Sequence, residues 1–194
     1  MPEPFIDGNN SSEFWILPCN NFWPVIQTSY KDLGILNPLL EKAIRKRGDA
    51  QEQSTNVKAD MTEWDMRKEE GAEHFETLCE WITKVVKRDT IKTTVPLADP
   101  LITHVWGNVY KRGHFTVKHC HIPATWSFVY FVNVSSKCSP LLFPDANFSV
   151  EPKDGKLVLF PSWLAHSVPE QTVSYERVAI AGNIMTLPPE EIEE

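Results

Sequence analysis

In the C-terminal half of the chain, short apolar runs alternate with turn signals, and this pattern constrains the fold more than any other feature. The runs share a length of four to nine residues and lie at residues 102–110, 115–121, 126–134, 140–143, 156–160 and 178–185. Asp154-Gly155 is a strong hairpin signal directly before the fifth run. Runs of this length and spacing predict an all-β sandwich or barrel.

The N-terminal half has helical periodicity instead. The clearest helix is predicted over residues 69–87, where apolar side chains recur every three or four positions at Phe75, Leu78, Ile82, Val85 and Val86. Such a stripe predicts a helix that covers a sheet. An earlier helix is predicted to begin with Asn37 as its cap and Pro38 as its first residue, and to end at Gly48.

The length of 194 residues predicts a single domain. Residues 1–90 would supply N-terminal strands and helices, 91–187 the β core, and 188–194 a frayed acidic tail. Residues 49–67 are polar and irregular, and they predict either a covering loop or a lid. Trp64 in this loop would either pack back onto the body or contact substrate.

Charge and cysteine content disfavour some classes of function. The net charge is −7, which disfavours a protein that grips nucleic acid by its phosphates. None of the four cysteines forms a C-x-x-C pair, which predicts free thiols in a reducing compartment. No window approaches a membrane span and no leader-like segment is present, so an intracellular, cytoplasmic and soluble protein is expected. The pattern says nothing of oligomeric state.

Three histidines have the spacing of metal ligands. In a strand, His119 and His121 would point to the same side and Cys120 to the other. By itself this pair fits two exposed strand histidines equally well. His166 lies on a distant run, and rolled sheets bring distant strands together, so it is a candidate third ligand or a lone histidine near a loop.

Arg177 begins the last predicted strand, which alternates between two kinds of face. One face consists of Val178, Ile180, Gly182 and Ile184, and the other of Arg177, Ala179, Ala181 and Asn183. The second face carries a guanidinium into an interior of small residues. A buried charge without a partner is costly, and a guanidinium prefers a carboxylate held bidentately. The partner would be either a protein Asp or Glu, or a bound carboxylate ligand.

With these residues in place, the segment from about residue 102 to 185 resembles the double-stranded β-helix (jelly roll) of the 2-oxoglutarate and iron(II)-dependent oxygenases. The nearest likeness is to the branch of this family that is found in bacteria and phages. The likeness to prolyl hydroxylases is more distant. The motifs that carry the resemblance are residues 106–110 with Gly113, 119–121, 127–133, 155–163 leading to His166, and 177–180. The resemblance implies a mainly β fold with the N-terminal helices packed on one sheet.

The resemblance also implies a ligand set. His119, His121 and His166 would hold Fe(II), and 2-oxoglutarate and O2 would be co-substrates. Arg177 would bind the far carboxylate of 2-oxoglutarate. Three further residues would line its pocket, namely Tyr110, Ser127 and Asn183.

The chain departs from the family pattern at two positions. The family's second metal ligand is usually acidic, whereas this chain has His121 there. Asp145 is a remote alternative source of the carboxylate. Phe131 stands where related enzymes often place a second tyrosine on the co-substrate, so a hydroxyl contact is lost.

The resemblance implies a dioxygenase (hydroxylase) that oxidises a C–H bond of a protein or small-molecule substrate and releases succinate and CO2. Two alternatives remain open at this point. A cupin-type metalloenzyme with three histidines would work without 2-oxoglutarate and has no need for Arg177. A non-catalytic jelly-roll binding module would bind no divalent metal. The primary substrate does not follow from the sequence.

Overall fold

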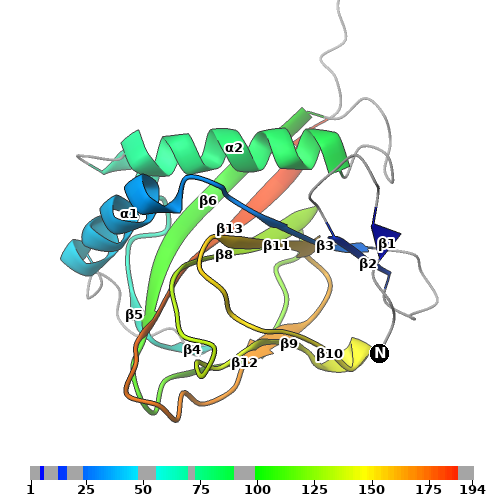
Figure 1. Ribbon diagram of the computed structural model, residues 1–194. Coiled ribbons are helices and arrows are strands. Elements are labelled where there is room, and N and C mark those ends of the chain that lie inside the picture. The colour runs from blue at the N-terminus through cyan, green and yellow to red at the C-terminus, as the bar shows by residue number, and fades with distance from the viewer. Residues whose placement is uncertain are drawn as a thin grey trace, which may run out of the picture.

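Two antiparallel sheets face each other, and two helices cover the outer face of the larger one (Figure 1). The computed structural model describes residues 5–6, 13–16, 24–47, 56–69, 73–89 and 99–187. The larger sheet runs in the order β1 (Phe5–Ile6), β2 (Glu13–Ile16), β3 (Pro24–Ser29), β11 (Lys156–Pro161), β8 (Trp126–Asn133), β13 (Arg177–Leu187), β6 (Asp99–Tyr110) and β5 (Asp60–Met61). The smaller sheet runs in the order β10 (Phe148–Val150), β9 (Leu141–Phe143), β12 (His166–Val168), β7 (Phe115–His119) and β4 (Val57–Lys58). This arrangement confirms the mainly β jelly-roll fold.

Each of the six predicted apolar runs contains a strand, but the second strand is shorter than expected. β7 ends at His119, and a turn follows that contains a cis peptide bond between Ile122 and Pro123. The backbone N–H of His121 donates to the carbonyl of Ser162 at 2.8 Å. The position of His121 is therefore set by this turn and not by strand alternation.

Helix α1 spans Leu33–Arg47, so the prediction that it begins at Asn37 is wrong. Asn37 is buried inside the helix, where its Nδ2 donates to the Val132 carbonyl at 2.6 Å and its Oδ1 accepts from the Tyr130 hydroxyl at 2.7 Å. The side chain is thus used in a tertiary contact and is not a cap. Pro38 is the sixth residue of the helix, past its first turn, so it removes one internal backbone hydrogen bond there.

Helix α2 spans Glu73–Asp89, close to its predicted position. All five residues of the predicted stripe are buried, and they pack in one cluster with Val178, Ile180 and Ile184 of β13. The predicted division of that strand into two faces is therefore confirmed. Neither of the two described helices is long and apolar enough to span a membrane.

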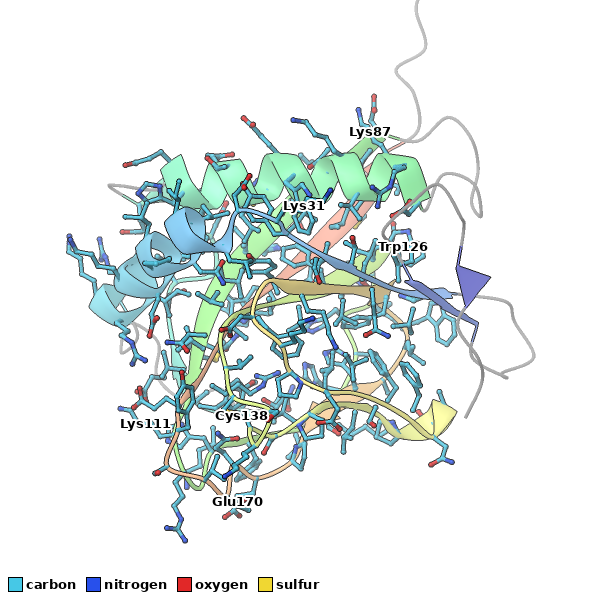
Figure 2. The ribbon with its side chains drawn as sticks, viewed as in Figure 1. Lys31, Lys87, Lys111, Trp126, Cys138 and Glu170 are labelled. Atoms are coloured by element: carbon cyan, nitrogen blue, oxygen red, sulfur yellow. The ribbon has the colours of Figure 1, made fainter. Side chains whose placement is uncertain are left out.

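The core has two layers, one between the helices and the larger sheet and one between the two sheets (Figure 2). In the outer layer α1 lies directly on β6 at Gly107, where an added Cβ would come within 2.5 Å of Ile44 Cγ1. The inner layer contains Trp106, Phe131 and Phe160, together with smaller side chains. The candidate site lies in this inner layer.

The described part of the predicted loop, residues 56–67, is more regular than expected. β4 pairs with β7 of the smaller sheet, and β5 pairs with β6 of the larger sheet, so this one segment joins an edge of each sheet. Trp64 remains 47% exposed, and its ring packs edge-on against Trp106 with a centroid separation of 5.0 Å. Residues 49–55 and the predicted tail 188–194 lie outside the described residues.

Candidate metal centre

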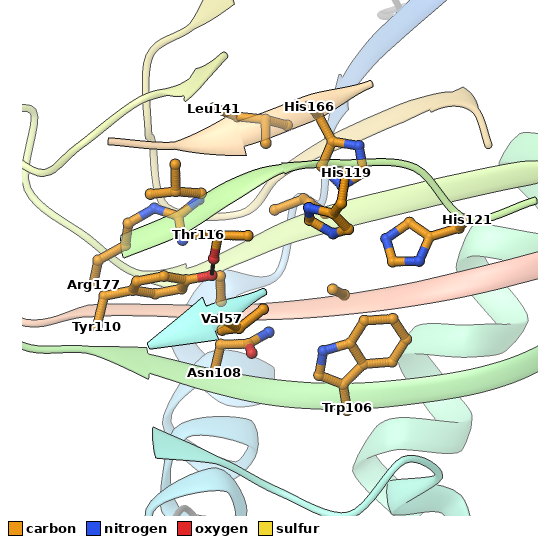
Figure 3. A pocket seen from close by; sticks show the side chains of 14 residues that line it. Val57, Trp106, Asn108, Tyr110, Thr116, His119, His121, Leu141, His166 and Arg177 are labelled. Carbon is orange, nitrogen blue, oxygen red and sulfur yellow. Dashed lines mark hydrogen bonds between the residues drawn. The ribbon is translucent and has the colours of Figure 1, made fainter. Parts of the chain in front are cut away.

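The three predicted histidines come together between the two sheets. His119 ends β7, His166 begins β12, and the two are register partners. His121 reaches the same place from the turn after β7. One ligand atom from each ring lies within 4.8 Å of the others, and the ring centroids are 4.4–5.1 Å apart (Figure 3).

Backbone carbonyls orient two of the rings. Nδ1 of His119 lies 2.8 Å from the carbonyl oxygen of Val117, and Nδ1 of His166 lies 3.2 Å from that of Leu164. A carbonyl only accepts, so each Nδ1 carries the proton and each Nε2 keeps a free lone pair. This is the tautomer that a metal-binding histidine needs, and the hydrogen bond fixes the ring for it.

Burial keeps the three imidazoles neutral. It lowers the pKa of His119, that of His121 to about 4 and that of His166 to about 3. The neighbouring rings of the group add a smaller lowering at His121 and His166. At neutral pH the group therefore offers three uncharged nitrogen ligands, which is the protonation state that binds a divalent metal.

We expect the metal-free protein to become less stable as the pH falls below about 6.5. An unfolded histidine takes up a proton near that pH, whereas folded His166 does so only near pH 3. Protons therefore favour the unfolded chain throughout this window, by about 2 kcal/mol at pH 5 for this one group. Thermal unfolding of His166→Phe and of the wild type, followed by circular dichroism from pH 7.5 to 5, should give a flatter slope for the variant. Equal slopes would contradict the prediction.

Arg177 is buried at the start of β13, with 1% of its surface exposed. Its Nε and Nη2 have no hydrogen-bond partner among the described residues. The guanidinium carbon lies 4.8 Å from the ring centre of Tyr110 and 5.0 Å from that of Phe131, and burial lowers the pKa of the group. Two unsatisfied donors on one planar fork present the geometry that a carboxylate fills bidentately.

One cavity connects Arg177 to the three histidines (Figure 3). It encloses about 50 Å³, and a buried water needs about 10–15 Å³ of such space. The cavity therefore has room for a small ligand several times the volume of a water molecule. Its remaining lining is Val57, Trp106, Asn108, Tyr110, Thr116, Val129, Leu141, Val168, Ala179 and Ala181.

Tyr110 lies at the Arg177 end of the cavity, as predicted, and its hydroxyl is 2.7 Å from the hydroxyl of Thr116. The sequence reasoning missed Thr116, Asn108 and Trp106. Strand alternation from Tyr110 pointed to the last two, because both lie on the same face of β6. Thr116 had no comparable signal, since it lies three positions before His119 on β7, which in a regular strand is the opposite face, and next to a register irregularity.

Three of the predicted site residues lie away from the cavity. Ser127 donates to Asn183 Oδ1 at 2.9 Å, and its hydroxyl lies 2.7 Å from that of Ser162. These two predicted pocket residues lie further along their strands, past Ala181, where the lining ends. Asp145 is exposed and forms an ion pair with Lys118, so it is outside the group. The ring of Phe131 faces the Arg177 guanidinium, and phenylalanine has no hydroxyl group that could bind a co-substrate.

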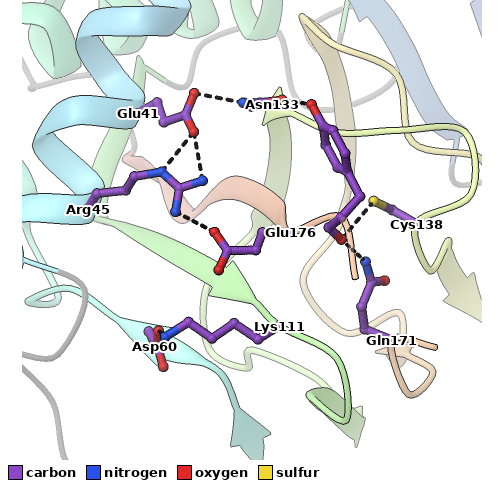
Figure 4. A network of polar contacts seen from close by, with 9 residues as sticks. Glu41, Arg45, Asp60, Lys111, Asn133, Cys138, Gln171 and Glu176 are labelled. Atoms are coloured by element: carbon purple, nitrogen blue, oxygen red, sulfur yellow. Dashed lines mark hydrogen bonds and ion pairs between the residues drawn. The ribbon is translucent and has the colours of Figure 1, made fainter. Parts of the chain in front are cut away.

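A polar network holds the strand that carries Arg177 (Figure 4). Gln171 is fully buried, and its side chain accepts from Ser139 N–H at 2.8 Å and donates to the Tyr175 carbonyl at 2.7 Å. Arg45 of α1 forms ion pairs with Glu41 and Glu176, the residue before Arg177. The ion pairs are partly exposed and therefore weak, so Gln171 is the main tie at this end of the barrel.

Replacement of Gln171 by Leu is expected to destabilise the protein by about 1–3 kcal/mol, because the buried Ser139 N–H would lose its acceptor, whereas the Tyr175 carbonyl keeps its contact with Cys138 Sγ at 3.7 Å. A thermal melt should detect a shift of roughly 2–12 °C for a chain of this size. Glu170→Leu at the adjacent exposed position is the matched control. Equal melting temperatures for wild type and Gln171→Leu would show that the network carries no stability.

Comparisons with known proteins agree with this geometry. Residues 144–183 match the model of a family described as "Putative 2OG-Fe(II) oxygenase". No curated protein sequence matches the chain. The resemblance predicted from the sequence is confirmed by the family match, and that family implies Fe(II), 2-oxoglutarate and O2.

Solved structures share the fold at low sequence identity. A viral collagen prolyl hydroxylase from Paramecium bursaria Chlorella virus-1, in complex with 2OG, has a TM-score of 0.62 at 14% identity. The alignment covers 81% of this chain and 94% of the viral chain. A prolyl-4-hydroxylase from Pseudomonas putida has a TM-score of 0.59 at 18% identity, with coverages of 82% and 90%. A prolyl hydroxylase from Trichoplax adhaerens, in complex with a peptide fragment, has a TM-score of 0.56 at 19% identity, with coverages of 77% and 78%.

Proposed function

We propose that this protein is a 2-oxoglutarate- and Fe(II)-dependent dioxygenase that hydroxylates a C–H bond. In the balanced reaction, R–H, O2 and 2-oxoglutarate give R–OH, succinate and CO2, with one oxygen atom entering the alcohol and the other succinate. The observation that carries the proposal is one small cavity with three neutral histidines at one end and, at the other, a buried arginine whose Nε and Nη2 have no partner among the described residues.

The residues of the chain divide the work between them. His119, His121 and His166 would hold the iron, which supplies the oxygen chemistry that no side chain provides. Arg177 would bind the far carboxylate of 2-oxoglutarate, and the hydroxyl of Tyr110 at the same end offers a further hydrogen bond. Because burial strengthens charge-assisted hydrogen bonds, this end of the cavity selects a dianion of fixed length.

The third imidazole changes the charge of the centre. A site with two histidines and one carboxylate reduces the charge of Fe(II) by one, whereas three neutral imidazoles leave it at two. The described residues place no carboxylate in the group, since Asp145 is paired with Lys118. The site is therefore suited to an anionic co-substrate that ligates the metal directly.

The same three histidines also fit a cupin-type dioxygenase that uses no 2-oxo acid. Arg177 separates the two functions, because only the first gives its buried guanidinium a partner. Oxygen uptake that requires Fe(II) but is indifferent to 2-oxoglutarate would select the cupin-type function and contradict the proposal.

The proposal is tested by following succinate by NMR after anaerobically loaded protein, Fe(II) and 2-oxoglutarate are exposed to O2. We expect slow succinate formation without a primary substrate, dependent on both Fe(II) and 2-oxoglutarate. His119→Ala should abolish it, and Asp145→Asn should leave it unchanged. Succinate formation that survives in His119→Ala would contradict the assignment of the iron site.

A further inference from the structure

A second depression lies on the other side of His121 and is open to solvent. It encloses about 360 Å³, several times the volume of the inner cavity. Its lining is Thr103, His104, Cys120, His121, Ile122, Pro123, Ala124, Asn183 and Met185. His121 lines both spaces, so a molecule in this outer groove lies against a ring that also faces the inner cavity.

The groove has no charged carboxylate, ammonium or guanidinium group in its lining, among the residues that the structure describes. A charged pair beside the groove residue Thr103 is already neutralised, because Arg67 binds both oxygens of Asp65 at 2.8 and 3.0 Å while reaching the carbonyl of Thr103 at 3.5 Å. A charged ligand entering this groove would lose hydration without gaining a counter-charge, which is costly. The groove therefore disfavours phosphate, carboxylate and ammonium groups.

Its walls combine apolar surface with a few hydrogen-bonding groups. Ile122 is 69% exposed, and Met185 and Pro123 extend the same apolar surface. The Thr103 hydroxyl donates to the Asn183 carbonyl at 3.2 Å, and the Asn183 side-chain oxygen accepts from Ser127. The side-chain amide of Asn183 is thereby oriented with its NH2 group as a donor for a carbonyl or hydroxyl oxygen of a ligand.

We propose that this outer groove binds the primary substrate and selects an uncharged, partly apolar group that carries a hydrogen-bond acceptor. The inference rests on the proposed function, because the shared wall at His121 brings the bound group to the metal. The chemistry is that of a neutral side chain with its adjacent amide, whether in a free small molecule or in a peptide.

The test uses the full chain with Mn(II) in place of iron and with 2-oxoglutarate bound. Mn(II) broadens the proton resonances of any probe held near it. The probes are N-acetyl-leucinamide, the same residue within an uncharged five-residue peptide, and N-acetyl amides of glutamate and lysine as charged counterparts of similar size. We expect the neutral probes to be broadened at least tenfold more than the charged ones. The ratio of the broadening of the two neutral probes shows whether the groove prefers a free small molecule or the same residue within a peptide.

Met185→Trp, which fills the groove, should remove the broadening, while Ile35→Trp on the exposed face of α1 should not. Mn(II) and 2-oxoglutarate affinities are titrated for both variants, so a failure of the inner site is recognised separately. With those affinities intact, equal broadening by charged and neutral probes, no broadening by any neutral probe, or unchanged broadening in Met185→Trp would each overturn the assignment of the groove.

Discussion

Arg177→Leu is expected to weaken 2-oxoglutarate binding strongly without weakening the metal-free fold. In the complex the variant lacks the partner of a buried carboxylate, and truncation of one member of such a pair costs about 2–5 kcal/mol. This corresponds to roughly a 30- to 4000-fold loss of affinity. In the free protein, the wild type instead keeps two guanidinium nitrogens of Arg177 buried without a partner among the described residues. Replacing Arg177 by Leu therefore removes a desolvation cost from the metal-free protein.

The loss of 2-oxoglutarate affinity and the unweakened metal-free fold are opposite in sign. The experiment therefore distinguishes a role of Arg177 in ligand binding from a role in folding. Calorimetric titration of the Mn(II)-loaded protein with 2-oxoglutarate measures the first, and thermal unfolding of the metal-free protein measures the second. Arg112→Leu replaces an exposed arginine near the same end of β6 and should change neither. A melting temperature that drops by more than about 5 °C, together with unchanged 2-oxoglutarate affinity, would show that Arg177 serves the fold and not a ligand.

His166→Ala is expected to lower the affinity for divalent metal by more than about 100-fold. Loss of a residue that only orients a metal ligand typically costs 10- to 100-fold, and His166 is proposed as a direct ligand. Titration with Co(II), followed by its visible absorption, measures the change. The same loss is expected for His119→Ala and His121→Ala, because the three rings form one group.

His104→Ala is the matched control for this series. His104 is an exposed histidine outside the three-residue group, so its removal should leave metal affinity at the wild-type value. If His121→Ala retained wild-type affinity while Asp145→Asn lost it, the carboxylate would be the third ligand and the three-histidine centre would be wrong.

The fold could be predicted from the sequence to a large extent because its signals are local. Alternating apolar runs and turn residues between 99 and 187 depend on neighbours within a few positions, and so does the apolar stripe of α2. Helix α1 shows where local signals fail. Asn37-Pro38 has the composition of a helix start, but the buried bonds of Asn37 to Val132 and Tyr130 connect positions more than 90 residues apart.

The candidate site likewise has features that local sequence signals predicted and features that they did not. The sequence by itself singled out the side chains that we propose carry the chemistry, because an H-x-H pair, a distant histidine and an arginine on a small-residue face are readable one residue at a time. The tertiary structure alone decided that His121 reaches the group through a turn, that Ser127 and Asn183 lie beyond the cavity, and that Arg177 has no acidic partner within the described part of the chain. Those outcomes depend on strand register and on what packs across the sheet, which are set by contacts between segments far apart in the chain.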